Sequence, residues 1–322
     1  MTSDTDRIVS RFGARSTALE VVEGIDLGGR HALVTGAAGG VGAETVRALA
    51  AAGAQVTLAV RRREQGEALA QRLRAERPGV RLQVATLDLA DPAGVARFAR
   101  DWLAGGQPLH LLVANAAIMA CPFAQTPQGW ESQFATNHLG HFALVRGLLP
   151  ALLAAAPARV VAVSSIGHKR SPIVFDDLHF ERRPYDKWSA YGQSKTANAL
   201  MAVGLHLRHA GDGLTANALH PGGIMTGLQQ HLSLDEQRAM GWLDAEDRPL
   251  SIFKSVEQGA ATSVWAATAP ELEGRGGRYL EDCSEGLPAT PGDRISGWAP
   301  HVRDPEAAQR LWDVSERLLE AA

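Results

Sequence analysis

The chain has 322 residues, of which 45% are hydrophobic, and a formal net charge of -3. This length and composition suffice for one large α/β domain or two small ones, each with a substantial core. Charged residues of both signs are interspersed, so neither a nucleic-acid-binding stripe nor an acidic tail is indicated, and we expect a small-molecule partner instead.

The order of elements predicts an α/β fold. Residues 1–28 are polar and weakly patterned, so we expect an N-terminal arm that lies over the surface and is partly disordered at its start. From His31 onwards, short apolar runs alternate with longer helical patterns, which indicates a parallel sheet. The expected strands are 31–35, 55–60, 81–86, 109–114, 159–164, 214–219 and 277–280. The expected helices are 42–52, 62–76, 91–103, 129–153, 188–209, 255–269 and 305–320. The prediction is a single doubly wound sheet with helices on both faces.

Neither an internal repeat nor a low-complexity linker divides the chain. We therefore expect one domain over residues 29–283 and a C-terminal extension, 284–322, that contains a docking helix. Two insertions, 166–187 and 224–249, interrupt the alternation after strand ends, where long connections usually shape a pocket. Their aromatic and methionine residues indicate a fairly large apolar ligand, and surface packing without a ligand is the alternative.

Cysteine usage and the N-terminus predict a cytoplasmic protein. Cys121 and Cys283 are far apart and outside any metal-type spacing, which is typical of a reducing compartment. Residues 1–13 contain no signal-peptide type apolar core, and no run approaches the roughly 18 apolar residues of a membrane span. We expect no membrane span.

A glycine-rich segment, TGAAGGVG at 35–42, follows the first strand and opens the first helix. There, a pyrophosphate can approach bare backbone and meet the amides of a helix N-terminus. Gly36, Gly40 and Gly42 fit one nucleotide-loop spacing. Gly36, Gly39 and Gly42 fit another. The loop alone does not choose between them.

The ends of the second and third strands bear on the choice of cofactor. Arg61 and Arg62 stand where a binder of NAD needs an acid for the ribose 2′-hydroxyl. Arginines can pair with a 2′-phosphate, so NADP is favoured over NAD; an exposed basic helix start is the alternative. Asp88, followed by Leu89, either accepts a hydrogen bond from the adenine amino group or caps the next helix.

Further polar residues follow later strands. Asn115 and Ala116 close the fourth strand, where small residues let a flat ring lie close to the backbone. Asn137 lies in a helical pattern, in which asparagine is mildly unfavourable. Ser165 ends a buried strand, where a serine is usually only a cap. After the sixth strand come a rigid turn and a hydroxyl, in Pro221, Gly222, Ile224 and Thr226.

Tyr191 and Lys195 are four residues apart in the helix 188–209 and therefore share one face. A free tyrosine has a pKa of about 10, so a nearby cation is needed to stabilise its phenolate at neutral pH. Lys195 is placed to do this, although an amphipathic helix can carry such a pair without using it. Histidines 138 and 141, like 206 and 209, lack a third ligand at zinc-like spacing, so we expect no metal site.

In this order, the motifs resemble those of the short-chain dehydrogenase/reductase superfamily, whose sheet is of the Rossmann type. Over residues 15–322, the chain is similar to the retinol dehydrogenase and WW-domain oxidoreductase group, through RSTALEVVEGIDLGG, NHLGHF, RYLEDC and RLWDV. Pro221-Gly222 and the length favour the dehydrogenase branch over the nucleotide-sugar epimerases. The chain departs from the pattern at Ala114 and Ala117, where Asn and Gly are usual, and at Ala38, where Asn or Ser is common.

The resemblance implies roles for four residues. Tyr191 is the general acid in carbonyl reduction, and Ser165 holds the carbonyl oxygen. Lys195 contacts the nicotinamide ribose and lowers the pKa of Tyr191, and Asn137 holds a water that links Lys195 to solvent. Tyr191 and Lys195 are also among the expected cofactor contacts, with Gly36, Ala38, Gly39, Gly40, Val41, Gly42, Arg61, Arg62, Asp88, Leu89, Asn115, Ala116, Pro221, Gly222, Ile224 and Thr226.

The expected activity is hydride transfer between NADP(H) and a carbonyl or alcohol group of a retinoid-, steroid- or polyketide-like compound. The alternative is a non-catalytic NADP(H)-sensing interaction protein on the same fold. Relatives of this kind often pair through helices equivalent to 129–153 and 188–209, so we expect a homodimer or homotetramer.

Overall fold

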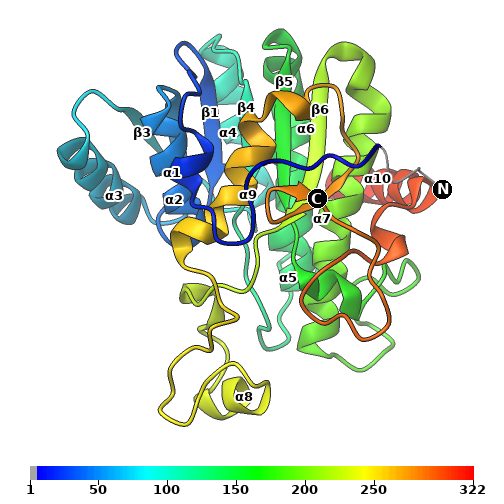
Figure 1. The fold of residues 1–322 in the computed structure, drawn as a ribbon. Coiled ribbons are helices and arrows are strands. Elements are labelled where there is room, and N and C mark those ends of the chain that lie inside the picture. Colours follow the sequence, from blue (N-terminus) through cyan, green and yellow to red (C-terminus); the bar gives the residue numbers. More distant parts are fainter. Residues whose placement is uncertain (1–5) are drawn as a thin grey trace.

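The computed structural model describes residues 6–322, in which eight strands form one sheet of order β3-β2-β1-β4-β5-β6-β7-β8 (Figure 1). The neighbouring strands from β3 to β7 pair in parallel, and β8 is antiparallel to β7. This confirms the predicted doubly wound sheet. The disorder expected at the start of the arm concerns residues 1–5, which lie outside the described part. The strands are β1 (His31–Thr35), β2 (Gln55–Val60), β3 (Arg81–Thr86), β4 (Leu111–Ala114), β5 (Ala158–Val163), β6 (Leu214–His220), β7 (Tyr279–Glu281) and β8 (Ser284–Glu285).

Most helices lie where the hydrophobic patterns predicted them. They are α1 (Ala18–Val21), α2 (Gly40–Ala51), α3 (Arg63–Glu76), α4 (Pro92–Ala104), α5 (Ser132–Phe134), α6 (Gly140–Ala154), α7 (Lys187–His209), α8 (Leu234–Ala239), α9 (Val256–Thr268) and α10 (Pro305–Glu320). Within residues 6–322, no helix is both long and apolar enough to cross a membrane.

The prediction of one continuous helix over 129–153 was wrong. Gly129 has φ +80°, which a right-handed helix does not allow. The Glu131 carboxylate accepts hydrogen bonds from the amides of Gln133 and Phe134 and so starts the short helix α5. A π-helix, Ala135–Leu139, then joins α5 to α6.

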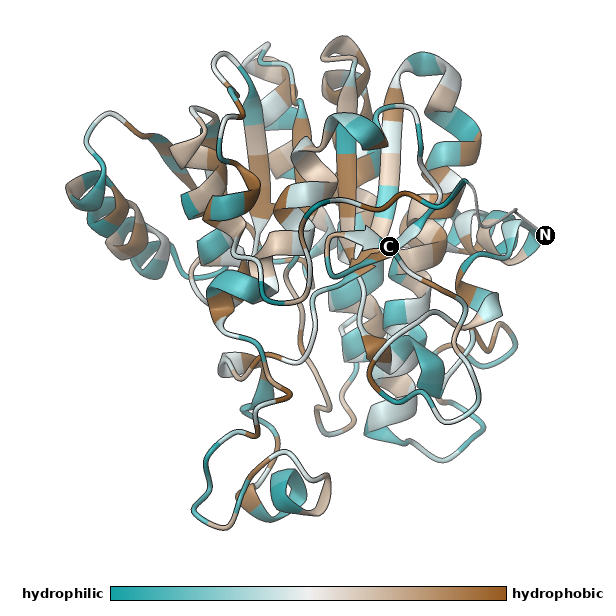
Figure 2. Ribbon diagram, viewed as in Figure 1, coloured by the Kyte–Doolittle hydropathy of each residue, from teal (hydrophilic) through white to brown (hydrophobic). Residues whose placement is uncertain are grey.

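The sheet is buried on both faces because successive strand residues point to opposite sides. Ala32 and Val34 belong to a cluster that includes residues of α1, α2, α3 and α9, whereas Leu33 belongs to a second cluster with α4, α6 and α7. Figure 2 shows the apolar colour concentrated on the central strands and the polar colour on outward-facing turns of the helices.

Both ends of the described chain pack onto this body. Ile8 is 3% exposed, and its carbonyl accepts a hydrogen bond from the amide of Glu285 in β8. At the other end, α10 packs against α7 (Figure 1). Trp312 of α10 packs edge-on against Phe142, with ring centroids 4.8 Å apart. A Cβ at Gly204 of α7 would come 3.2 Å from the Trp312 ring, so the absence of a side chain there admits this close approach.

The strand order reverses between β1 and β4. Connections from these two strands run to opposite sides of the sheet, so their carboxyl ends leave a crevice in which ligands of such sheets bind. The loops that follow β1, β4, β5 and β6 all start from this edge.

Candidate active site

The loop after β1 is shaped by three glycines. Gly36 and Gly40 have φ +64° and +52°, which favour glycine. A Cβ at Gly42 would lie 2.4 Å from the carbonyl oxygen of Gly36, so a side chain is excluded there. Gly39 is extended, at φ -166°, and a Cβ on it would meet nothing within 4 Å. Of the two spacings, Gly36, Gly40 and Gly42 are therefore the set that the fold requires.

The start of α2 is suited to an anion. Gly39 is the N-cap of α2 and supplies no side-chain hydrogen bond to its first amides. Ala38 and Val41 are partly buried and pack against the core, which holds the loop in place. Free amides and the helix dipole together favour a negatively charged group at this position.

Asn115 joins the ends of β4 and β1. Its amide nitrogen donates to the carbonyl oxygen of Thr35 at 2.8 Å, and its backbone N–H donates to the Thr35 hydroxyl at 2.9 Å. The N–H of Ala116 donates to the same hydroxyl at 3.0 Å. A Cβ at Gly36 would lie 2.8 Å from Cα of Ala116, so the two loops are in close contact.

The side chains expected around the adenosine end differ in their surroundings. Arg61 and Arg62 are exposed at the end of β2, and neither side chain has a hydrogen bond or ion pair within residues 6–322. The helix-cap interpretation of Asp88 is wrong, because Asp91 precedes α4. Asp88 is exposed and instead accepts a hydrogen bond from the N–H of Ala90 at 2.9 Å. Leu89 is buried against Gly140.

The segment after β6 lies close to the glycine-rich loop. Pro221 leads into Gly222, which has φ +98°, and Ile224 packs against Gly259 of α9. A Cβ at Gly40 would lie 3.2 Å from the methyl group of Thr226. The Thr226 hydroxyl caps a short 3-10 helix by accepting from the N–H of Leu228 at 3.2 Å.

Ser165, Tyr191 and Lys195 meet at the carboxyl end of β5. The Tyr191 ring and Ser165 Oγ both lie against Gly167, and the Ser165 side chain lowers the pKa of the Tyr191 hydroxyl. Lys195 Nζ lies 5.6 Å from the centroid of the Tyr191 ring and donates to the carbonyl oxygen of Val163 at 3.0 Å. A Cβ at Gly167 would come 2.9 Å from the Tyr191 ring and 3.3 Å from Ser165 Oγ, so glycine leaves room for this pair.

Burial determines the protonation of these groups. It raises the pKa of Tyr191 to about 12, against a smaller lowering by the hydrogen bond with Ser165. It lowers the pKa of Lys195 to about 7. In the protein by itself, removal from water therefore raises the Tyr191 pKa, and the lowering expected from Lys195 is not seen.

Asn137 lies in the π-helix and is fully buried. Its amide nitrogen donates to the carbonyl oxygen of Ile118 and to Ser194 Oγ, both at 2.9 Å, and its amide oxygen accepts from the N–H of Ile118 at 2.9 Å. The side chain thus fastens the loop after β4 to the residue that precedes Lys195. Within the described residues, it has no hydrogen bond to Lys195 itself.

The sequence did not reveal a buried group behind Ser165. His168 Nδ1 lies 2.6 Å from the carbonyl oxygen of Ser165 and 2.9 Å from the hydroxyl of Tyr279, and its Nε2 accepts from the N–H of Ala299. The N–H therefore sits on Nδ1 and holds the Ser165 backbone. His168 and Tyr279 are 111 residues apart in the chain, and no spacing links them.

Apolar side chains pack around Tyr191. Tyr191 belongs to a buried cluster with Met119, Ala120 and Leu232. Partly buried residues pack against this cluster from α7 and from the 224–249 insertion, namely Trp188, Leu228, Met240 and Trp242. The 224–249 segment, with α8, extends away from the sheet in Figure 1.

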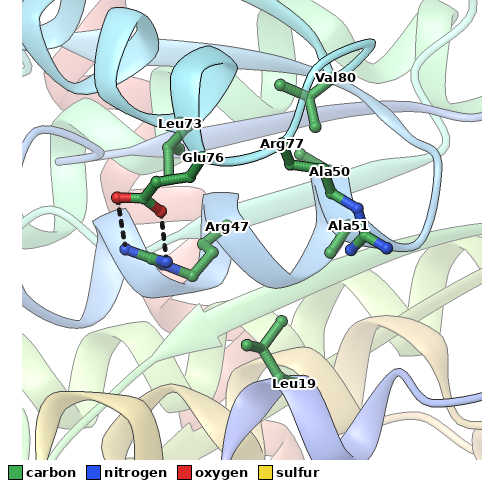
Figure 3. A pocket seen from close by; sticks show the side chains of 8 residues that line it. All are labelled: Leu19, Arg47, Ala50, Ala51, Leu73, Glu76, Arg77 and Val80. Carbon is green, nitrogen blue, oxygen red and sulfur yellow. Dashed lines mark hydrogen bonds and ion pairs between the residues drawn. The ribbon is translucent and has the colours of Figure 1, made fainter.

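A separate hollow of about 230 Å³ lies between α1, α2 and α3 (Figure 3). Leu19 and Ala51 line it, and Arg47 pairs with Glu76 across it at 2.5 Å. The C-terminal parts of α2 and α3 form its wall, at the amino ends of β2 and β3. The hollow is therefore at the sheet edge opposite Tyr191, and no predicted site residue lines it.

Among residues 6–322, no group of three or more His, Cys, Asp or Glu is placed to hold a metal ion. His138 lies 2.9 Å from the Ser315 hydroxyl, and His209 pairs with Asp212 at 3.0 Å. Cys121 and Cys283 are free and buried.

Comparison with known proteins identifies related sequences over most of the chain. The family model described as short chain dehydrogenase matches residues 30–237. A Streptomyces antibioticus protein named "Probable oxidoreductase" is 52% identical over 92% of this chain and 100% of its own length. The WW domain-containing oxidoreductase of Danio rerio is 39% identical over 96% of this chain and 73% of its own length.

Solved structures share the fold. A crystal structure of an uncharacterized protein from Mycobacterium paratuberculosis has a TM-score of 0.72 and 34% identity, and the match covers 95% of this chain and 98% of that one. The Pseudomonas aeruginosa RhlG/NADP active-site complex has a TM-score of 0.59 and 26% identity, covering 80% of this chain and 95% of that one.

Proposed function

The chain belongs to the short-chain dehydrogenase/reductase family and is an oxidoreductase of that family. We propose that it uses NADP(H) to interconvert a carbonyl group and the corresponding alcohol of a fairly large apolar compound. The observation that carries the proposal is the meeting of three side chains at the carboxyl end of β5: Ser165 Oγ and the Tyr191 ring both lie against Gly167, and Lys195 Nζ is 5.6 Å from the centroid of that ring.

These three side chains suit carbonyl reduction. With a pKa of about 12, the Tyr191 hydroxyl is protonated at neutral pH and can donate its proton to a carbonyl oxygen. The Ser165 hydroxyl holds the same oxygen by a hydrogen bond. As negative charge develops on Tyr191, the nearby charged form of Lys195 stabilises it. Asn137, through Ser194, helps to fix the helical turn that carries Lys195.

The cofactor site fits a dinucleotide. The start of α2 offers uncapped amides to a pyrophosphate, and the open space at Gly39 leaves the backbone accessible. The nicotinamide, when bound, supplies or accepts the hydride. Asp88 and Leu89 would contact the adenine, Asn115 and Ala116 the cofactor cleft, and Lys195 the ribose. The turn at Pro221, Gly222, Ile224 and Thr226 would contact the carboxamide.

The preference for NADP over NAD rests on Arg61 and Arg62. Both guanidinium groups are exposed and without protein partners in the described chain, at the strand end where the ribose 2′-phosphate is bound in sheets of this kind. The amide of Gly36 donates to the carbonyl of Ala59 at 3.0 Å, so this strand end is tied to the phosphate loop. The related RhlG structure contains NADP, which supports the proposal.

The substrate's apolar character rests on the cluster around Tyr191. Trp188 and Trp242 meet edge-on at 6.1 Å between ring centroids, and Trp242 meets Phe253 at 5.9 Å. A retinoid-, steroid- or polyketide-like compound would bury its rings or chain against these groups. Cytoplasmic location and a homodimer or homotetramer belong to this proposal as sequence-based predictions. α10 covers part of α7, so pairing through α7 would use the uncovered part.

The first test replaces Tyr191 by Phe in the full chain. We expect Tyr191→Phe to lose at least about 100-fold in kcat for every carbonyl that the wild type reduces, because one positioned proton donor contributes about 10²–10⁴-fold. Binding of NADPH, followed by fluorescence, should change far less than kcat, since the phenol is only one of many expected cofactor contacts. Tyr185→Phe is the matched control, because its hydroxyl bonds the carbonyl of Cys121 instead.

The panel of carbonyls and alcohols should include retinoids, steroids and polycyclic aromatic ketones. Unchanged reduction by Tyr191→Phe would refute the role of Tyr191 as proton donor. Binding of NADPH by a wild type that reduces no carbonyl of the panel would instead favour the NADP(H)-sensing interaction protein.

The second test measures the cofactor preference. We expect NADPH to bind more tightly than NADH, and Arg61→Asp to weaken NADPH binding by about 10- to 100-fold, because a charge-assisted hydrogen bond to phosphate is replaced by repulsion. Arg63→Asp is the control for general charge, since Arg63 pairs with Glu67 on α3 at 2.9 Å. Equal affinities of the wild type for the two cofactors would contradict the phosphate argument.

A further inference from the structure

A fully buried histidine, His141, connects the two halves of the candidate site. His141 is the second residue of α6, which follows the π-helix in the sequence. Its Nε2 lies 2.8 Å from the Thr35 hydroxyl at the end of β1, and its Nδ1 lies 2.8 Å from the carbonyl oxygen of Asn137. Burial lowers the pKa of His141 to about 4, so the ring is neutral at physiological pH.

The hydrogen-bond partners determine the direction of each bond. The Thr35 hydroxyl already accepts from the N–H groups of Asn115 and Ala116, at 2.9 and 3.0 Å. Its own hydrogen therefore points to His141 Nε2 at 2.8 Å rather than to the carbonyl of Val113 at 3.5 Å. With Nε2 accepting, the ring carries its hydrogen on Nδ1 and donates it to the Asn137 carbonyl. The opposite tautomer would place two acceptors against each other.

The two hydrogen-bond partners of His141, Thr35 and Asn137, each make further hydrogen bonds. On one side, the Thr35 hydroxyl fixes the backbone that follows β4, and Asn115 returns a hydrogen bond to the Thr35 carbonyl beside the glycine-rich loop. On the other side, the Asn137 amide bonds Ser194 Oγ, next to Lys195. A single imidazole thus lies between the segment that holds the dinucleotide loop and the helix that carries the proton-transfer residues.

We propose that His141 is a positioning residue that couples the dinucleotide-binding loop, through Thr35, to the turn of α7 that carries Lys195, through Asn137. The inference rests on the proposed function, since it assigns His141 a part in that same site. Among the described residues, His141 has no hydrogen bond to Ser165, Tyr191 or Lys195, and it reaches the glycine-rich segment only through Thr35, so its effect passes through Thr35 and Asn137.

The test compares two pairs of variants in the full chain. His141→Leu removes both hydrogen bonds, whereas His141→Gln retains a donor and an acceptor. Thr35→Val removes the hydroxyl at nearly constant shape, whereas Thr35→Ser retains it. We expect His141→Leu and Thr35→Val each to weaken NADPH binding and to lower kcat by about ten-fold, because each leaves a buried polar partner unsatisfied. Gln and Ser at these positions should restore most of both losses.

The double variant measures the coupling. If Thr35 and His141 act as one unit, the double variant Thr35→Val/His141→Leu should lose little more than the worse single variant. Effects that multiply would overturn the inference.

His138→Leu is the matched control. His138 is buried in the π-helix, but it bonds Ser315 on α10 at 2.9 Å, away from Thr35. Its substitution should lower the melting temperature while leaving the affinity for NADPH and kcat within about two-fold. If His141→Leu behaves in the same way as His138→Leu, the role of His141 is structural and the inference fails, although the proposed function stands. If the wild type neither binds NADPH nor reduces any carbonyl of the panel, both the function and the inference are overturned.

Discussion

Lys195 is expected to destabilise the folded protein, so that Lys195→Met should stabilise it while abolishing catalysis. The side chain is 2% exposed, and no carboxylate is paired with it among the described residues. Burial of an ammonium group without a counter-ion costs free energy. Methionine fills similar space without charge. The Val163 carbonyl, which accepts from Lys195, also accepts from Asn198 Nδ2 at 3.2 Å and therefore stays hydrogen-bonded in the variant.

The magnitude follows from the pKa and depends on pH. The lysine pKa is about 10.4 in an unfolded chain, and burial lowers it to about 7 in the folded protein. Below pH 7, both states carry the charge and the full cost applies, on the order of 2–5 kcal/mol at about 1.4 kcal/mol for each pH unit of difference. Between pH 7 and about 10, the unfolded state binds more protons, so the stability of the wild type rises with pH.

The gain in free energy of unfolding from Lys195→Met should therefore be largest near pH 6 and should shrink towards pH 10. Urea denaturation followed by circular dichroism at pH 6.0, 8.0 and 9.5 measures it. Lys187→Met is the control on the same helix, since Lys187 is partly exposed and pairs with Glu236; we expect a change below about 1 kcal/mol at each pH. A variant no more stable than the wild type at pH 6, or a gain that does not vary with pH, would refute the reasoning.

Two further predictions concern the loop and the C-terminal helix. Gly42→Ala should lower the melting temperature and weaken NADPH binding, because its Cβ would lie 2.4 Å from the Gly36 carbonyl, whereas Gly39→Ala, whose Cβ meets open space, should keep the melting temperature; equal melting temperatures for the two variants would contradict this. Trp312→Ala should lower the free energy of unfolding by about 3–5 kcal/mol in urea denaturation, because the ring is 8% exposed and packs against Phe142. A loss below about 1 kcal/mol would show that α10 is not an integral part of the core.

The strands were predictable because parallel strands buried on both faces read as continuous apolar runs between turn residues. The observed bounds of β1, β2 and β3 are the predicted ones. The break before α6 was not predictable from hydrophobic periodicity, since residues 129–153 keep an apolar pattern throughout. The break depends on the positive φ of Gly129 and on the capping bonds of Glu131, which involve tertiary placement.

In the candidate site, too, some features were predictable from the sequence and others were not. The proximity of Tyr191 and Lys195 follows from helical spacing, and that of the glycine-rich loop and Asn115 from the strand order. Spacing gives no information on desolvation, and the rise in the Tyr191 pKa caused by burial was therefore not predicted. Nor does it show that Asp88 closes a turn, because the alternative cap, Asp91, lies only three residues further along.

Three departures from ordinary local structure lie at the same edge of the sheet. The helix α2 starts after Gly39 without a side-chain cap, a π-helix at Asn137 interrupts the helical segment, and Lys195 is buried with no carboxylate paired to it in the described part of the chain. Each departure is unfavourable when considered by itself, since capping residues, regular helical bonds and paired charges are the stable alternatives. Such departures concentrate at functional sites. A bound dinucleotide would remove the first by accepting from the free α2 amides, and a developing phenolate at Tyr191 would partly offset the third. Two of the three unfavourable features are thus located where the proposed ligand binding and proton transfer would relieve them, which argues for a site already organised for its ligand rather than one assembled by it.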